Sequence, residues 1–438
     1  MSTAFAQDQG QRHETRSCAT SLVCQRCERS FPLSETVFAC SDCGRNLDVE
    51  FDYELASRTL REVPLDQRPM NIWRFEELLP IVDANAQRRV GQFSGFTPLI
   101  KADRLGEALG LRNLYIKDDS TNRPSLSYKD RVVSMSVARL LELGKHEIGC
   151  VSTGNVGTAL AALAAKAGVP AYVFYPNRLE HTKALACRAL GAKVCQVDGN
   201  YDEANKQCRE VALATGMEFA NITLRPFYAE GAKTMSFEIV EQLGWKAPDH
   251  ILTAAAGGTL SSRIHKGLIE LERVGLAPTS EVKLHIAQPD GCAPIASAIL
   301  ADEPDIHACK PTTAAHSLAI GDPGDGHLVI DAVRTRGGTA RRASDHEIFA
   351  AVDLLAATEG VLTEPAGGTT IAVLRKLAQE QVLDPDEVVV AIITGNGLKT
   401  LEDHPAKPWP SMVSCDAETM RHTLEELQHE SAADASVG

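Results

Sequence analysis

The sequence contains no apolar run that approaches the roughly 20 residues needed to cross a bilayer, and its polar start lacks the apolar centre of a signal peptide. These two absences predict a cytoplasmic protein with no membrane partner. The chain also lacks any cluster of lysine and arginine interleaved with aromatic residues, and its net charge of −14 repels a polyanion. Nucleic acid is therefore not an expected partner.

The composition that is present is typical of a globular protein. Of the 438 residues, 44% are hydrophobic and 23% are charged. A chain of this length is too long for one small core, so we expect two packed lobes and an appendage. From about residue 97, helical patterns alternate with short β-rich runs, such as AYVFYP at 171–176 and VVVAII at 388–393. This alternation predicts α/β lobes in which helices cover both faces of parallel sheets.

Four of the twelve cysteines form two close pairs, in the sequences CQRC and CSDCG. Thiolates two residues apart on tight turns face one tetrahedral zinc ion, and two such pairs complete a closed shell of four sulfur ligands. The expected ligands of this structural zinc site are Cys24, Cys27, Cys40 and Cys43. A redox pair, or a knuckle that has lost its metal, is the alternative. The other thiols show no paired spacing, and most are expected to be buried structural residues.

The stretch PSLSYKDR at 124–131 places a lysine where an irregular run becomes a helix. Apolar residues recur at helical spacing up to Gly144, so Lys129 falls in or just before the first turn. Helix dipoles and partial burial are both expected to lower the pKa of an ammonium group there. A neutral Lys129 is a nucleophile suited to forming an imine with an aldehyde. The alternative from position alone is an exposed lysine paired with Asp130.

Three further loops follow predicted strands. STGNVG at 152–157 opens an alanine-rich helix whose first amide groups hold a carboxylate or phosphate. AAAGGT at 254–259 carries little side chain, so its amides close round a phosphate; it lacks the P-loop lysine and the dinucleotide pattern, and suits a small phosphate monoester. ITGNG at 393–397 places the hydroxyl of Thr394 at the carboxyl end of a strand. Each loop alone is also compatible with an ordinary helix cap or glycine turn.

Together the four loops resemble those of the fold-type II pyridoxal-phosphate enzymes, and most closely those of the threonine synthase family. SYKDR is similar to that family's S-F-K-D-R motif, STGNVG to S-T-G-N-T-G, AEGAKT to E-G-x-K-T and ITGNGLKT to T-G-x-G-L-K. The cysteine pairs also recur in its longer members, and the resemblance covers roughly residues 20–403. It implies a tryptophan synthase β-like α/β fold of two three-layer αβα lobes, with pyridoxal 5'-phosphate in the cleft and a zinc-ribbon-like knuckle before them.

The resemblance also implies a role for each loop residue. Lys129 would hold the cofactor and act as the catalytic base, Asn155 would bind the phenolic oxygen of the cofactor, and Thr394 its ring nitrogen. The cofactor phosphate would be bound by Ala255, Ala256, Gly257, Gly258 and Thr259. The expected substrate contacts are Ser152, Thr153, Asn155, Arg225, Tyr228 and Lys233. The implied reaction converts O-phospho-L-homoserine and water to L-threonine and phosphate by γ-elimination and β-addition.

Three positions depart from the family pattern. LRPFYAEG places Tyr228 where the family has a phosphate-binding arginine, Val156 replaces a threonine, and the phosphate loop lacks its usual asparagines. In a divergent threonine synthase, the substrate phosphate would be taken by Arg225, Lys233 or Arg131. The first alternative is a cysteate synthase, or another β- or γ-replacement enzyme acting on a phosphorylated or activated amino acid. The second alternative is a threonine or serine dehydratase. A binding module built on the zinc knuckle would require the lysine loop to be accidental.

The motifs imply an order of segments along the chain. It comprises a disordered N-terminus at 1–20, a zinc-ribbon-like knuckle at 21–55, a large cofactor-binding lobe at 56–104 and 226–410, a small αβα lobe at 105–225 and an acidic C-terminal tail at 411–438. A short helix is expected in that tail. By the same resemblance, we expect a homodimer that acts on a small-molecule amino-acid substrate.

Overall fold

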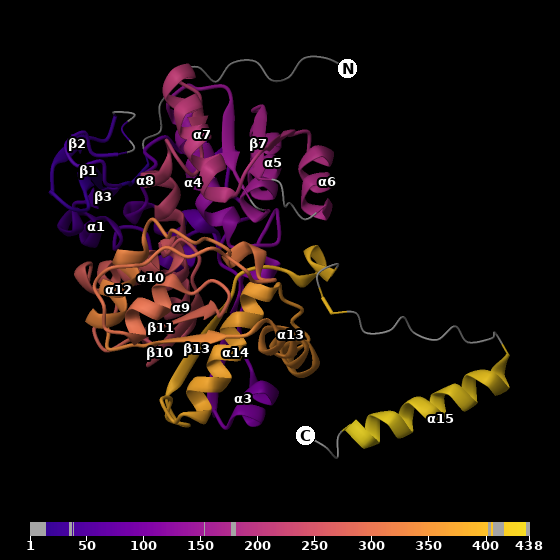
Figure 1. Cartoon of the computed structure of the whole chain (residues 1–438). Helices are drawn as coiled ribbons and strands as arrows, with labels where there is room; N and C mark the ends of the chain where they lie inside the picture. The colour runs from indigo at the N-terminus through magenta and orange to yellow at the C-terminus, as the bar shows by residue number, and fades with distance from the viewer. Residues whose placement is uncertain are drawn as a thin grey trace. The chain divides into compact units, whose positions relative to one another are not determined.

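The computed structural model describes residues 15–34, 37, 39–152, 154–176, 181–401, 404–405 and 416–434. The chain divides into two compact units, Met1–Glu402 and Asp403–Gly438 (Figure 1). Within the second unit, α15 (Ala417–Asp434) is a single helix in the acidic tail, where a helix was expected. All other described helices and strands belong to the first unit. In the part of the chain that is described, no helix has the length and apolar character needed to cross a membrane.

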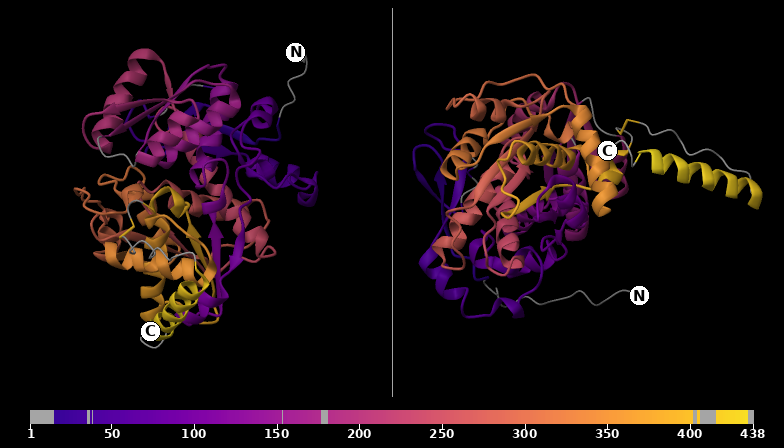
Figure 2. Two further views of the ribbon diagram at one scale, coloured as in Figure 1. Left: turned by 90° about the vertical axis from the view of Figure 1, so that its right-hand side faces the viewer. Right: turned by 90° about the horizontal axis from the view of Figure 1, so that it is seen from below.

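A six-stranded sheet forms the core of the larger lobe (Figures 1 and 2). Its strands lie in the order β12-β11-β10-β13-β5-β4, and all neighbours are parallel except β4, which is antiparallel to β5. The strands are β4 (Leu99–Lys101), β5 (Asn113–Asp118), β10 (His250–Ala254), β11 (Lys283–Pro289), β12 (Ala340–Ala343) and β13 (Val388–Ile393). The run VVVAII coincides with β13, and its residues are almost all buried because helices cover both faces of the sheet.

Alternate residues of the central strands pack into two different hydrophobic cores. Ile251 and Val390 pack with residues of α9 to α12, whereas Leu252 and Val389 pack with residues of α3, α13 and α14. The sheet is therefore the middle of three layers, as the sequence predicts. The helices are α3 (Asp103–Leu109), α9 (Thr234–Gln242), α10 (Thr259–Arg273), α11 (Pro294–Leu300), α12 (Gly326–Thr335), α13 (Asp345–Glu359) and α14 (Pro365–Gln379).

A smaller parallel sheet, in the order β8-β7-β6-β9, forms the second lobe. Its strands are β6 (Ile148–Val151), β7 (Ala171–Pro176), β8 (Lys193–Val197) and β9 (Glu218–Phe219). One face packs on α4 (Lys129–Glu142) and α5 (Asn155–Ala167), with α6 (His181–Ala189) beside α5. The other face packs on α7 (Tyr201–Thr215) through a separate apolar cluster. This lobe is also a three-layer αβα structure.

The division between the two sheets differs from the expected lobe boundary at one strand. The small lobe was expected to begin at residue 105, but β5 belongs to the six-stranded sheet. The reason is its parallel pairing with β13, which runs from Asn113 opposite Val388 to Asp118 opposite Ile393. The first strand of the smaller sheet is β6.

The cysteine-rich segment folds as a three-stranded antiparallel sheet of β1 (Ala19–Cys24), β2 (Ser30–Pro32) and β3 (Leu47–Phe51). Two short helices follow, α1 (Tyr53–Thr59) and α2 (Ala84–Arg89). Asp48 of β3 forms ion pairs with Arg263 at 2.6 Å and Lys266 at 2.8 Å, both on α10. These charged contacts attach the cysteine-rich sheet to a helix of the large lobe.

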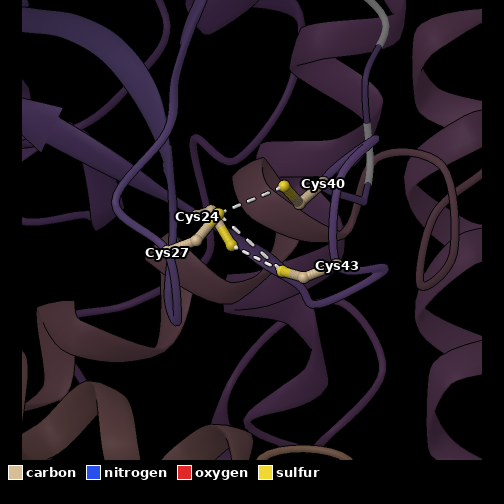
Figure 3. A group of neighbouring side chains, drawn as sticks. All are labelled: Cys24, Cys27, Cys40 and Cys43. Atoms are coloured by element: carbon tan, nitrogen blue, oxygen red, sulfur yellow. Dashed lines mark hydrogen bonds between the residues drawn. The ribbon is translucent and has the colours of Figure 1, made fainter.

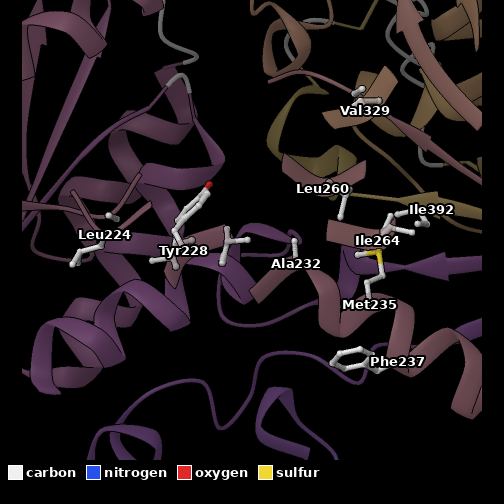
Figure 4. Close-up of a cluster of buried hydrophobic side chains, with 14 of the residues drawn as sticks. Leu224, Tyr228, Ala232, Met235, Phe237, Leu260, Ile264, Val329 and Ile392 are labelled. Carbon is white, nitrogen blue, oxygen red and sulfur yellow. The ribbon is translucent and has the colours of Figure 1, made fainter. Parts of the chain in front are cut away.

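One hydrophobic core continues from the small lobe into the large lobe. Leu224, Tyr228, Ala232 and Met235 recur every three or four residues along α8 (Arg225–Glu230), the following 3-10 turn and α9. Figure 4 shows these side chains in a row that leads towards Leu260 and its neighbours on α10. Packing of this continuous row sets the position of the loops that lie between the two sheets.

Candidate active site

A cavity of about 460 Å³ opens at the carboxyl ends of strands from both sheets. Its wall includes Ser152 after β6, Ala255 after β10 and Thr394 after β13. Lys129, at the start of α4, lines the same cavity. Ligands of α/β folds bind at such strand ends. The structure thus brings together the four loops that the sequence singled out.

Contacts between α4 and the loop after β13 hold Lys129 in the cavity. The backbone N–H of Tyr128 donates to the carbonyl oxygen of Thr394 at 2.9 Å. Ser127 and Gly395 form an isolated antiparallel bridge beside this hydrogen bond. α4 begins at Lys129, so the lysine lies in the first helical turn, as the sequence predicts. The strand end and the helix start therefore form one fixed unit.

The pKa of Lys129 is shifted in the direction opposite to the prediction. Burial lowers the pKa of the ammonium, but the neighbouring Tyr128 and Tyr228 raise it by more, to above the ordinary lysine range. The ammonium donates a hydrogen bond to the Tyr128 hydroxyl at 2.6 Å and lies 4.4 Å from the centre of that ring. The predicted lowering of the pKa is thus wrong for the free side chain, which becomes a nucleophile only after losing its proton.

Asp130 does not pair with the lysine. Its carboxylate is fully buried and accepts a hydrogen bond from the backbone N–H of Ser125 at 2.9 Å. Burial raises the pKa of Asp130 to about 7. The alternative of an exposed Lys129–Asp130 ion pair is therefore contradicted, since Lys129 lines a cavity and Asp130 braces the preceding loop.

The loop between β10 and α10 has the features of an anion site. Gly258 has a φ of 93°, and a Cβ atom there would lie 2.9 Å from the backbone of Asp325, so the position requires glycine. Among the described residues, the backbone N–H groups of Ala256, Gly257 and Gly258 have no hydrogen-bond acceptor. Free amide donors before a helix N-terminus are the groups that bind a phosphate. The residues present therefore fit a phosphate-bearing ligand.

Asp325 connects Arg225 to the same loop. Its carboxylate accepts from the Thr259 hydroxyl at 2.9 Å and pairs with the Arg225 guanidinium. Arg225 also donates to the Thr259 hydroxyl at 3.3 Å. Burial raises the pKa of Asp325, but Arg225 and Arg263 lower it by more, so the carboxylate is charged. Arg225 lines the cavity at the edge of the predicted phosphate loop.

Asn155 is held by charged partners that the sequence reasoning did not assign. Its side-chain amide nitrogen donates to the two oxygens of Glu364, at 3.0 and 2.8 Å, and its amide oxygen accepts from Lys399 at 2.9 Å. Lys183 and Lys399 each lie 3.4 Å from the Glu364 carboxylate. Burial raises the pKa of Glu364, but the two lysines lower it by more. The sequence signal for two of these charges was present, since Glu364 lies in TEPAGG and Lys399 in GLKT, and Glu364 lines the cavity.

Ser152 is placed to bind an anion through its own proton. Its hydroxyl oxygen accepts from the backbone N–H groups of Gly154 at 2.9 Å and Gly157 at 2.8 Å. These two bonds leave the hydroxyl hydrogen to donate into the cavity. Tyr228, a further predicted substrate contact, is largely buried and also lines the cavity. Thr153 lies outside the described residues.

Two cations that were expected to bind the substrate phosphate lie outside the cavity wall. Lys233 is fully buried, 2.6 Å from the Glu230 carboxylate and 2.9 Å from that of Glu270. Arg131 is also fully buried and pairs with two other carboxylates. Neither side chain is among those that line the cavity. Both cations instead stabilise the interior, because a buried charge requires partners, and the geometry opposes the substrate contact predicted for them.

The four predicted zinc ligands meet at the end of the cysteine-rich sheet (Figure 3). Their sulfur atoms all lie within 4.8 Å of one another. The distance between sulfur atoms is 3.4 Å for Cys24 and Cys43, 3.5 Å for Cys27 and Cys40, and 3.8 Å for Cys27 and Cys43. These distances exceed the roughly 2.05 Å of a disulfide bond. The arrangement matches a tetrahedral metal site, since zinc–sulfur bonds of about 2.3 Å give sulfur–sulfur edges of about 3.8 Å.

Comparison with known proteins identifies the class. Residues 90–395 match a family model described as pyridoxal-phosphate dependent enzyme. Solved structures with the same fold include diaminopropionate ammonia lyase from Escherichia coli, with a TM-score of 0.62 and 19% identity over 89% of this chain and 97% of that one. Threonine deaminase from Solanum lycopersicum has a TM-score of 0.58 and 19% identity over 71% of this chain and 86% of that one. The chain therefore belongs to the pyridoxal-phosphate-dependent enzymes and has their fold-type II architecture.

Relatives with higher sequence identity than these solved structures indicate which family within this class the chain resembles. A threonine synthase from Methanocaldococcus jannaschii is 35% identical over 407 residues, which are 92% of this chain and 99% of that protein. A threonine synthase from Methanosarcina acetivorans is 36% identical over 380 residues, or 86% of this chain and 92% of the relative. A threonine synthase from Mycobacterium tuberculosis is 35% identical over 350 residues, or 78% and 92%. The family resemblance predicted from the four loops is confirmed.

Proposed function

We propose that this chain converts O-phospho-L-homoserine and water to L-threonine and phosphate. One observation carries the proposal: the similarity to threonine synthases extends over nearly their full length, and the motif residues that it includes meet in a single cavity. Lys129, Asn155, Gly258 and Thr394 lie on separate segments of the sequence, yet all line that cavity. Independent glycine turns and helix caps would have no reason to converge in this way.

The cavity residues fit pyridoxal 5'-phosphate. Lys129 would hold the aldehyde carbon, and the free N–H groups at 256–258, together with the Thr259 hydroxyl, would bind the phosphate. Asn155 would bind the phenolic oxygen and Thr394 the ring nitrogen. A hydroxyl at that nitrogen, in place of a carboxylate, leaves the pyridine ring largely neutral. When bound, the cofactor supplies an electron sink that acidifies the α-proton of an amino acid.

Lys129 is the residue that would move protons in this reaction. Its amine, once released from the cofactor, lies in the cavity on a flexible side chain that reaches several neighbouring carbon atoms. Tyr128 accepts a hydrogen bond from the Lys129 ammonium, so it would favour the charged form of the lysine after a proton has been taken from Cα. Ser152 would orient the substrate carboxylate through its free hydroxyl hydrogen.

The first test of this proposal measures the products formed from O-phosphohomoserine by the wild type and by Lys129→Ala. The purified protein incubated with O-phosphohomoserine should release phosphate and threonine in equal amounts. Replacement of Lys129 by alanine should abolish both products. Phosphate release without threonine would contradict the proposed water addition, whereas threonine formation by Lys129→Ala would contradict the role of the lysine.

The position of Tyr228 favours one second candidate. Where the family has an arginine for the substrate phosphate, this chain has a buried phenol at the cavity wall. A sister enzyme on the same scaffold, such as a cysteate synthase that joins phosphoserine and sulfite, fits this change in the site. Formation of cysteate from that mixture, with no threonine from O-phosphohomoserine, would favour the second candidate. A threonine or serine dehydratase would instead release ammonia from the unphosphorylated amino acid.

The four cysteines form the second part of the proposal, a structural zinc site. All four positions of the tetrahedron are taken by sulfur, which leaves none for a substrate. We expect one zinc ion per chain by elemental analysis and a loss of that zinc in Cys43→Ser, with a lowered melting temperature. A full complement of zinc in this variant would contradict the assignment. We also propose a homodimer, on the basis of the family resemblance, and sedimentation analysis tests it. A cytoplasmic location is proposed on the basis of the sequence.

A further inference from the structure

The cations of the cavity raise the question of which of them binds the substrate phosphate. Among the described residues, four cationic side chains line the cavity: Lys129, Lys206, Arg209 and Arg225. Lys129 is assigned to the cofactor. Arg225 is paired with Asp325 and donates to Thr259, at the loop assigned to the phosphate of the cofactor. The remaining two cations both lie on α7.

Helix α7 presents one polar face to the cavity. Its buried face consists of Ala204, Cys208 and Ala212, spaced four residues apart. Five residues of α7 line the cavity, namely Tyr201, Asp202, Asn205, Lys206 and Arg209. Positions three and four apart lie on one side of a helix, so these side chains are neighbours along the cavity mouth.

The two cations of this face differ in their surroundings. Lys206 forms no hydrogen bond or ion pair with any part of the chain that the structure describes, although it lines the cavity. An amine in this position is available to an incoming anion. Arg209 lies three residues further along α7 and already interacts with another group of the chain. A guanidinium has five N–H donors, so Arg209 can bind phosphate oxygens in addition to its present partner.

Two acidic residues restrict where an anion fits beside α7. Asp202 lies near the start of the helix, and Asp322 from the loop before α12 also lines the cavity. Burial raises the pKa of Asp202, and the nearby charge of Asp322 raises it further. Both carboxylates repel a phosphate. A dianion is therefore favoured at Lys206 and Arg209, one and two turns away from Asp202.

We propose that Asn205, Lys206 and Arg209 of α7 bind the phosphate group of an O-phosphorylated amino-acid substrate. This inference rests on the proposed function, because it concerns the substrate of the same cavity. The α7 site supplies the positive charge that Tyr228 lacks. The departing phosphate would remain paired with two cations, which stabilises the leaving group.

The test uses the holoenzyme with Lys206→Gln, Arg209→Gln and the double variant. Loss of a charged hydrogen bond should raise KM for O-phosphohomoserine about tenfold in each single variant. Lys206→Arg, which keeps the charge, should restore most of the wild-type KM. The exposed Lys166 of α5 provides the control, and Lys166→Gln should keep the wild-type KM.

A binding measurement separates phosphate recognition from a general effect on the site. The probes are 2-amino-5-phosphonopentanoate and norvaline, which lacks the phosphonate group. Wild-type protein should bind the phosphonate much more tightly than norvaline, and the double variant should bind the two with similar affinity. If the wild type forms threonine and the variants keep its KM and its preference for the phosphonate, the α7 site is wrong and the proposed reaction survives. If the wild type forms no threonine, and the double variant lacks the preference for the phosphonate that the wild type shows, the proposed reaction is wrong and the α7 site survives.

A second inference follows from a different contact, between the cysteine loop and the cavity. Asn46 lies three residues after Cys43 and lines the cavity. Its backbone oxygen accepts from the N–H of Gln25 at 3.2 Å, which ties it to the other cysteine pair. Its side chain donates to Asp325 at 3.2 Å, and Asp325 in turn accepts from Thr259.

We infer that Asn46 is a positioning residue that links the cysteine loop to the phosphate loop of the cofactor. It holds one oxygen of Asp325, and the other oxygen orients Arg225 and Thr259. A change in the cysteine loop therefore changes the site without any contact between metal and ligand.

Asn46→Ala tests this link in the holoenzyme. We expect the cofactor to dissociate about three to ten times faster during dialysis, as expected when one hydrogen bond is lost, while the zinc content stays at the wild-type value. Arg45→Ala, at the exposed neighbouring position, serves as the control and should lose cofactor at the wild-type rate. An unchanged rate of cofactor loss in Asn46→Ala would refute the link. Loss of zinc in that variant would also contradict it, because Asn46 would then stabilise the cysteine loop itself.

Discussion

Asn155 and Glu364 show how single residues in this cavity depend on partners distant in the sequence. Lys183 and Lys399 approach Glu364 from two different segments, and Glu364 and Lys399 both form hydrogen bonds with the Asn155 amide. All are largely buried. Because a buried charge without a partner is strongly destabilising, each of the three requires the others. The orientation of Asn155 is thus a property of the whole cluster.

Borohydride reduction tests whether Lys129 holds the cofactor. If it holds the cofactor, borohydride treatment of the wild type should fix the cofactor covalently, and the labelled peptide should contain residue 129. The Lys129→Ala protein should lose the label, because no other amine replaces the lysine at the start of α4. Lys166→Ala, on an exposed part of α5, should be labelled like the wild type. An undiminished label in Lys129→Ala would place the cofactor on another lysine.

Among the secondary-structure elements, α10 connects three parts of the site. Its first residue, Thr259, belongs to the phosphate loop. Ile264 on its apolar face packs into the core shared by both lobes (Figure 4). Arg263 and Lys266 hold Asp48 of the cysteine-rich sheet. The position of the phosphate loop therefore depends on the core and on the N-terminal sheet together.

Gly258, immediately before α10, is expected to tolerate no side chain. A Cβ atom in Gly258→Ala would lie 2.9 Å from the backbone of Asp325, in a backbone conformation with positive φ. We expect this variant to lose about 1–3 kcal/mol of stability and to bind the cofactor more weakly. Gly257→Ala is the matched control, since its Cβ would meet only Ile320, at 3.6 Å. Equal melting temperatures of the two variants would show that the strain at Gly258 is relieved elsewhere.

The stability of the whole molecule depends on buried imidazoles in the six-stranded sheet. His285 of β11 accepts a hydrogen bond from the backbone N–H of Thr339 at 3.2 Å, so its other ring nitrogen donates to His250 at 2.8 Å. His250 then donates to Glu387 at 2.6 Å. Burial, with a smaller contribution from the nearby His250, lowers the pKa of His285 to about 3. The folded protein therefore keeps this imidazole neutral.

This arrangement predicts a dependence of stability on pH. The unfolded chain protonates His285 near pH 6.5, whereas the folded chain does so only near pH 3. Between these values the unfolded state binds more protons, so stability falls as the pH falls, by up to about 1.4 kcal/mol per pH unit for this group. Melting temperatures at pH 7 and pH 5 should differ less in His285→Gln than in the wild type. The exposed His307 gives a control, and a wild-type pH dependence in His285→Gln would contradict the assignment.

The fold was predictable from the sequence to the extent that its signals are local. The apolar runs at 171–176 and 388–393 became β7 and β13 with the expected bounds. β13 is almost fully buried, as a continuous apolar run predicts, whereas three of the six residues of β7 are only partly buried. The place of β5 was not predictable, since it depends on pairing with a strand about 275 residues later. The raised pKa of Lys129 escaped prediction for a similar reason, as part of it comes from Tyr228, far along the chain.

The sequence alone determined the class of chemistry in this protein. Its motifs consist of residues close together in the sequence, so they can be recognised without the fold. They are a lysine at a helix start, a glycine pair, a hydroxyl at a strand end and four spaced cysteines. Only the tertiary structure decided which cations line the cavity. Lys233 and Arg131 became interior ion pairs, whereas Lys206 and Arg209 lie at the cavity mouth. The physical reason is that the free energy of a charge depends on its burial and its partners, which are set by segments brought together only in the folded chain.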